Sequence, residues 1–252
     1  MNAEYKMKSA AITQETAEGR AAEVLDKAKK QVGFIPNMYA NMVNSPGLLE
    51  TYLDGYALFR KESGFSTQEQ EVIFLAISRV NGCDYCVAAH SFIADAKSGL
   101  AAEITDAIRG GHPIQDGKLA ALADFTTIMV RKRGLPAKAD VEAFLDAGYT
   151  ERHILEVILG ISVKTISNYS NHIFHTEVDE VFADRAWTDS HAACRFAART
   201  SGVRASTRPP SRGAGYFASR PGVVHHVITL PARRSGMTRP SSTSCPRLPP
   251  SR

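Results

Sequence analysis

Several features that mark other classes of protein are missing from this sequence. No run of eighteen apolar residues occurs, so no transmembrane helix is predicted. The first twenty residues contain no apolar segment, so we expect no secretory signal and a cytoplasmic location. Cysteine is scarce, with four residues in the chain. A close cysteine pair in the cytoplasm is more often catalytic or metal-binding than a structural disulfide.

Alternation of polar and apolar residues, the pattern of half-buried strands, is also missing over any useful length. The sequence has neither a glycine-rich phosphate loop nor a GxSxG motif. Apolar residues recur instead at helical spacing, for example Ala21, Val24, Leu25 and Ala28. We therefore predict an all-α fold with helices over 15–32, 46–61, 66–80, 83–99, 101–109, 118–133, 139–147 and 151–174.

Two local signals set helix ends near the middle of the chain. Ser66 and Glu69 have the spacing of a capping box at a helix start. Asn81-Gly82 is a helix-stop signal, and a new helix is expected at about Cys83. These two helices are therefore joined by a tight turn and should pack against each other.

Charge divides the chain into two parts. Residues 189–252 contain eleven Arg, one Asp, no Lys and no Glu, a net charge of +10, whereas residues 1–188 carry −6. The second part is rich in Arg, Pro and Ser, a composition that buries too little apolar surface to fold. We predict a helical domain over 1–188 and a disordered C-terminal tail over 189–252. The loss of Lys and Glu favours an out-of-frame or foreign coding stretch over a functional basic arm.

The most informative stretch is NGCDYCVAAH, residues 81–90. Cys83, Cys86 and His90 stand at i, i+3 and i+7, so they point from one face of the predicted helix. A thiolate at a helix start is stabilised by unpaired N–H groups and the helix dipole. Cys83 lies one turn from Cys86, and His90 is placed to take or relay a proton.

A carboxylate on the preceding helix completes this group. Glu71 lies twelve residues before Cys83, on the side of Phe74, Leu75 and Ser78. Because the two helices should pack together, Glu71 is expected to approach His90. A buried Glu beside a His is a common way to hold and tune a base.

The pattern Glu71-x11-Cys83-x2-Cys86-x3-His90 resembles the signature of the carboxymuconolactone decarboxylase-like superfamily, in its alkylhydroperoxidase D-like, peroxidase-related branch. The segment NYSNHIFHT, residues 168–176, is also similar to the later part of such proteins. The resemblance covers residues 35–187. It implies an alkylhydroperoxidase D-like helical bundle and an antioxidant oxidoreductase. One residue departs from the branch, because Tyr85 stands where its best-known peroxidases carry His.

The resemblance also implies roles for the four residues. Cys86 would attack a hydroperoxide and become a sulfenic acid, and Cys83 would resolve it into a redox-active disulfide. His90 would be the proton-transfer base for Cys86, with Glu71 in the relay. A dithiol or thiol reductant would reduce the disulfide, without any bound cofactor or metal. Such proteins are commonly homo-oligomers, trimers or hexamers, and no membrane or nucleic-acid partner is expected.

Other interpretations of the cysteine pair stay open at this point. The two residues also fit an inert buried pair or a zinc site completed by another ligand. Within the same fold, a carboxymuconolactone decarboxylase-type lyase is the alternative reaction, although it needs no second thiol. A non-catalytic redox-sensing protein would form the same disulfide stoichiometrically.

Overall fold

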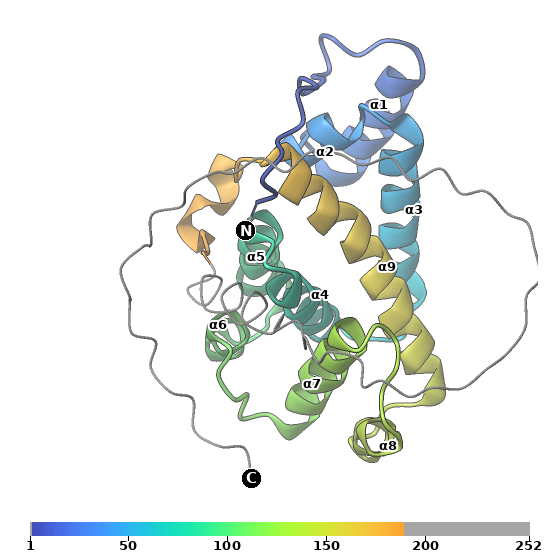
Figure 1. Cartoon of the computed structure of the whole chain (residues 1–252), viewed down its shortest axis with the longest axis vertical. Coiled ribbons are helices and arrows are strands. Elements are labelled where there is room, and N and C mark those ends of the chain that lie inside the picture. Colours follow the sequence, from blue (N-terminus) through green and yellow to red (C-terminus); the bar gives the residue numbers. More distant parts are fainter. Residues whose placement is uncertain (1, 189–252) are drawn as a thin grey trace, which may run out of the picture. The chain divides into compact units, whose positions relative to one another are not determined.

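The computed structural model describes residues 2–188 (Figure 1), and the predicted tail, 189–252, lies outside them. The described residues form nine α-helices and no strand, which confirms the all-α class. None of their helices combines the length and hydropathy needed to cross a membrane. The elements are α1 Gly19–Val32, α2 Asn37–Met42, α3 Pro46–Glu62, α4 Thr67–Asn81, α5 Asp84–Ile93, the π-helical η1 Ala94–Ser98, α6 Ala102–Gly110, α7 Gly117–Arg131, α8 Lys138–Asp146, α9 Glu151–Phe174 and the 3₁₀-helical η2 Glu180–Arg185.

Helix α4 lies at the centre of this body, in contact with α5, α7 and α9. Every residue from Glu69 to Ser78 is buried. The predicted capping box is confirmed: the Glu69 N–H donates to Ser66 Oγ at 3.2 Å, and the Ser66 N–H donates to Glu69 Oε2 at 2.9 Å. Because α4 is buried over nearly all its length, its polar side chains need partners from neighbouring helices.

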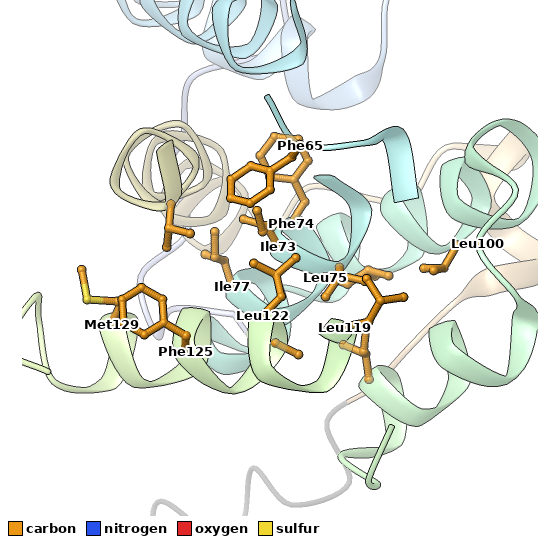
Figure 2. Close-up of a cluster of buried hydrophobic side chains, with 14 of the residues drawn as sticks. Phe65, Ile73, Phe74, Leu75, Ile77, Leu100, Leu119, Leu122, Phe125 and Met129 are labelled. Atoms are coloured by element: carbon orange, nitrogen blue, oxygen red, sulfur yellow. The ribbon is translucent and has the colours of Figure 1, made fainter. Parts of the chain in front are cut away.

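Two hydrophobic clusters meet at Tyr56 of α3 and Leu159 of α9, which pack against both. In the first, Phe74 and Ile77 of α4 pack with Leu122 and Phe125 of α7 (Figure 2). The second gathers side chains from α1, α2, α3 and α5, and both cysteines belong to it. Tyr56 packs against both clusters, so the cysteine helix and the central helix share one continuous interior.

Small residues let α9 lie close to α3 and α4. A Cβ atom at Gly160 would stand 3.2 Å from both Ile73 Cγ2 and Phe59 Cε2. A Cβ atom at Gly55 would stand 3.0 Å from Val163 Cγ2. Both distances are tighter than most Cβ contacts, so glycine at these two positions favours the close approach. Because α9 packs so closely against α3 and α4, the middle of α9 lies in the interior, where the candidate site is.

The structure corrects some predicted element bounds. Helix α1 begins at Gly19 rather than residue 15, because Thr16 Oγ1 accepts the Thr13 N–H at 3.0 Å and holds a turn there. The predicted helix 83–99 is α5 followed by the π-helical η1. Sequence periodicity missed α2 and η2, since six residues are too few to show it. Helix α9 has the predicted bounds.

Ser66→Ala is expected to destabilise the protein by about 1 kcal/mol, because it removes the hydroxyl that accepts the Glu69 N–H. Urea unfolding followed by circular dichroism measures this change. Ser45→Ala is the matched control, since Ser45 precedes α3 without a side-chain cap hydrogen bond. Equal destabilisation by both substitutions would contradict the role of the cap.

Candidate functional site

The turn between α4 and α5 sets the position of the cysteines. Gly82 has φ 69°, a left-handed conformation that suits glycine, and its N–H donates to the Arg79 carbonyl at 3.0 Å. The next N–H, of Cys83, donates to the Ser78 carbonyl at 2.9 Å. Cys83 is therefore the N-cap residue of α5, and Cys86 lies in its first turn, as the sequence predicted.

Both thiols are free and buried, and both contact α9. The side-chain amide of Asn171 donates to the Cys86 sulfur at 3.3 Å and to the Cys83 sulfur at 3.8 Å. Ser167 Oγ lies 3.8 Å from the Cys86 sulfur. One amide that reaches two sulfurs shows that the pair shares one polar environment. Sequence reasoning did not assign these contacts to Ser167 and Asn171.

Glu71 and His90 meet in the interior, as predicted. Glu71 Oε2 lies 2.8 Å from His90 Nδ1, and the carboxylate is fully buried. Its other oxygen accepts a hydrogen bond from the half-buried guanidinium of Arg60. Arg60 also donates to Tyr56 Oη at 2.6 Å. Burial raises the pKa of Glu71, but His90 and Arg60 outweigh that effect and lower it.

Lys164 of α9 is a site residue that sequence reasoning missed. It is 1% exposed, and its Nζ lies 2.9 Å from His90 Nε2. The same ammonium stands over the Phe74 ring, 5.5 Å from the ring centre. A sequence signal existed: Lys164 is the only Asp, Glu, Lys or Arg within 157–174, a stretch whose apolar residues place it in the interior.

The two partners of His90 assign its tautomer. An ammonium has only hydrogens to donate, so Lys164 donates and Nε2 accepts. Nδ1 therefore carries the proton and donates to Glu71. Burial and the adjacent Lys164 charge lower the pKa of His90 to about 4. The imidazole is thus neutral near pH 7, and its ring nitrogens contact Glu71 and Lys164.

The two cysteines differ electrostatically. Burial and the neighbouring Cys86 raise the pKa of Cys83. Burial also raises the pKa of Cys86, but a hydrogen bond from Cys83 and the charge of Lys164 outweigh it, and the pKa lies well below its ordinary value. Cys86 is therefore the group that ionises first.

A cavity of about 110 Å³ opens onto Cys86. Its wall also includes His90 and Lys164, whereas Cys83 is not part of it. The remaining lining is mostly apolar or aromatic: Val32, Pro36, Met38, Tyr39, Tyr52, Tyr56, Tyr85, Ala89, Ile93 and Phe182. Tyr85, where the resembling peroxidases carry His, turns its hydroxyl away to Asp179 Oδ2 at 2.5 Å. A small molecule in this cavity meets the Cys86 sulfur.

Metal ligation is the other chemistry that cysteine and histidine offer. Within residues 2–188, no group of three or more His, Cys, Asp and Glu side chains is arranged to hold a metal ion. His90 Nε2, the ring nitrogen free of a proton, accepts from Lys164. The arrangement among the described residues is that of an acid–base and thiol site.

The pKa of His90 makes stability depend on pH. In the unfolded state His90 has a pKa near 6.5 and binds a proton below that pH. In the folded state it binds the proton only near pH 4. Stability is therefore lost as pH falls from about 6.5 to 4, by about 3 kcal/mol at most. Urea unfolding at several pH values measures this loss in the wild-type protein. His90→Gln is expected to flatten the dependence in that range, and an equally steep loss in this variant would contradict the assignment.

Part of the chain matches a known protein family. Residues 46–127, from the start of α3 into α7, match the carboxymuconolactone decarboxylase family. This segment contains Glu71, Cys83, Cys86 and His90. No curated protein gives a significant match to the chain.

Solved structures resemble about 70% of the chain. The alkylhydroperoxidase AhpD core of a peroxidase-related protein from Ralstonia eutropha JMP134 has a TM-score of 0.61 and 20% identity, over 69% of this chain and 93% of that one. A peroxidase-related protein from Silicibacter sp. TM1040 has a TM-score of 0.58 and 20% identity, over 70% and 95%.

A third similar structure is that of a debrominase. Bmp8, as a cysteine-to-alanine variant in complex with 2,3,4-tribromopyrrole, has a TM-score of 0.59 and 15% identity, over 71% of this chain and 96% of that one. At these identities the three structures establish the fold, and reactions differ among its members. Residues 46–127 therefore match the carboxymuconolactone decarboxylase family, and the helical body has the fold of alkylhydroperoxidase D-like proteins.

Proposed function

We propose that this protein is a thiol-dependent peroxidase that reduces a hydroperoxide with Cys86 and Cys83. The observation that carries the proposal is the asymmetry of the pair. Cys86 lines the cavity and has the lowered pKa, whereas Cys83 lies behind it with a raised pKa. A nucleophile that meets the substrate and a second thiol that follows it are the two parts such a reaction needs.

The chemistry proceeds in two balanced steps. The Cys86 thiolate attacks the terminal oxygen of ROOH, the O–O bond breaks, and the products are Cys86–SOH and ROH once the alkoxide has taken a proton. The Cys83 thiol then attacks the Cys86 sulfur and releases water, leaving a Cys83–Cys86 disulfide. The two residues stand one helical turn apart, a separation that a disulfide spans.

An external thiol then closes the cycle. A dithiol reduces the disulfide by exchange and leaves as its own disulfide, so the protein returns to two thiols. We expect the functional form to be a homo-oligomer, because proteins of the resembling branch commonly assemble. Exposed apolar side chains on α9, among them Leu155 and Ile158, support such contacts.

The cavity favours a small organic hydroperoxide. Its volume is that of a few water molecules, and four tyrosines, Met38 and Phe182 form nearly half of its lining residues. Apolar and aromatic walls stabilise an alkyl or aryl group by removing its surface from water. tert-Butyl hydroperoxide is therefore a suitable first substrate.

Reductive removal of a halogen is the second candidate reaction. It uses the same two thiols: Ar–Br, the Cys86 thiolate and the Cys83 thiol give Ar–H, bromide and the disulfide. The aromatic cavity wall and the likeness to a debrominase that binds 2,3,4-tribromopyrrole favour this candidate over a lyase, which needs no pair of thiols.

Reduced protein mixed with one equivalent of tert-butyl hydroperoxide is expected to lose two thiols and form a Cys83–Cys86 disulfide, mapped by mass spectrometry. Because Cys194 and Cys245 add background thiols, both are replaced by Ser in every sample. Cys86→Ser should reduce peroxide consumption to background. Cys83→Ser should still react once and leave a sulfenic acid that dimedone traps.

Turnover with excess dithiothreitol separates an enzyme from a sensor. Many equivalents of peroxide consumed per chain indicate catalysis, whereas one equivalent indicates a stoichiometric sensor. Bromide release from 2,3,4-tribromopyrrole, with no loss of peroxide, would favour the second candidate. Thiols that stay alkylatable with both reagents would contradict the proposal.

A further inference from the structure

Two antiparallel helices face each other across the site in matching register. Helix α5 carries Cys83, Cys86 and His90 at i, i+3 and i+7, and α9 carries Lys164, Ser167 and Asn171 at the same spacing. Asn171 contacts both sulfurs, Ser167 contacts Cys86, and Lys164 contacts His90. Cys83, Cys86 and His90 therefore each contact a polar side chain of α9.

Lys164 is the charged member of this set and needs a counter-charge. An ammonium on a side chain that is 1% exposed loses most of its hydration, which is costly unless an anion lies near. Within the described residues, the Glu71 carboxylate already binds His90 and Arg60. The contacts of Lys164 are with a neutral imidazole and the Phe74 ring. An anion on the cavity side balances the charge, and Cys86 is the acidic group there.

We propose that Lys164 is the counter-ion of the Cys86 thiolate and the acid that protonates the oxygen leaving from the substrate. The proposal rests on the peroxidase function above. The family resemblance makes His90 the proton-transfer base for Cys86, but the ring nitrogens of His90 contact Glu71 and Lys164. His90 is thus a positioning residue, which holds the ammonium at the cavity wall where it lies with Cys86.

With Lys164 as the acid, attack of Cys86 on the hydroperoxide needs no proton from solvent. The Cys86 thiolate takes the terminal OH of ROOH, the O–O bond breaks, and the electron pair leaves on RO⁻. Lys164 gives its proton to RO⁻, which yields Cys86–SOH, ROH and a neutral amine. After a dithiol has reduced the disulfide, the Cys86 thiol returns its proton to the amine and restores the ion pair.

Titratable groups of α2, α3, α5 and α9 interact with Cys86, and Lys164 is the cation with the largest effect on it. Burial opposes ionisation of Cys86, and Lys164 lowers its pKa in spite of that burial. The other titratable groups that act on this thiol are Cys83 at the N-cap of α5, Tyr85 and His90 of α5, His172 of α9, Tyr52 and Tyr56 of α3, and Tyr39 of α2. Glu71 of α4 and Arg60 of α3 act on His90. Removing Lys164 leaves these groups in place.

The first experiment measures the Cys86 thiol directly. In full-length protein with Cys83, Cys194 and Cys245 replaced by Ser, the rate of alkylation by iodoacetamide is followed against pH. Lys164→Met is expected to raise the thiol pKa by at least about one unit, roughly a tenfold loss of thiolate at neutral pH. Lys164→Arg should retain most of the effect. Lys61→Met is the control, because that lysine is 82% exposed on α3.

Circular dichroism and thermal unfolding establish that each variant is folded. If Lys164→Met is not folded, Lys164→Gln is used in its place. The glutamine amide has no charge but can still donate a hydrogen bond to His90. An unchanged alkylation profile in the folded neutral variant would overturn the counter-ion assignment. This readout needs no peroxide, so it stands or fails independently of the proposed function.

The second experiment tests the proton donor through the leaving group. tert-Butyl hydroperoxide releases a basic alkoxide, whereas peracetic acid releases acetate, which needs no proton. Rates of sulfenic acid formation are compared at a pH where Cys86 is fully ionised in both proteins. Lys164→Met should slow the alkyl hydroperoxide at least about tenfold more than the peracid. Equal slowing would overturn the acid role, and a wild-type protein inert to both would overturn the peroxidase function alone.

Discussion

A buried chain of polar contacts, running from Arg60 through Glu71 and His90 to Lys164, is the interaction on which the site depends. It joins α3, α4, α5 and α9 in an interior of low dielectric, where each partner stabilises the next. Removing one member leaves a buried charge or an unmatched imidazole beside it. The same contacts therefore fix the relative position of four helices and the protonation state of the histidine.

This chain also explains why two cysteines from one motif behave differently. Cys83 caps the start of α5 and is buried behind Cys86, where desolvation favours its thiol. Cys86, one turn later, lies at the cavity with Lys164 across from it. In the proposed reaction, the roles of attacking and resolving thiol follow from which sulfur lines the cavity and from where α9 places its cation.

Local patterns predicted a large part of this arrangement. The capping box at Ser66 and the glycine stop at Gly82 act within a few residues, so their outcome needed no knowledge of distant packing. The approach of Glu71 to His90 followed from a tight turn between two helices. The start of α1 was predicted too early because a threonine turn competes with the helix, and α2 was missed because it is short.

By itself the sequence determined the helical class, the common face of Cys83, Cys86 and His90, and the carboxylate beside them, because helix geometry and turn chemistry act over short distances. Tertiary structure decided which groups complete the site. Lys164 lies 74 residues from His90 along the chain and meets it because α9 packs against α3, α4 and α5. Because of that contact, His90 Nε2 accepts a hydrogen bond from the Lys164 ammonium and not from the Cys86 thiol, since one acceptor nitrogen binds one close donor.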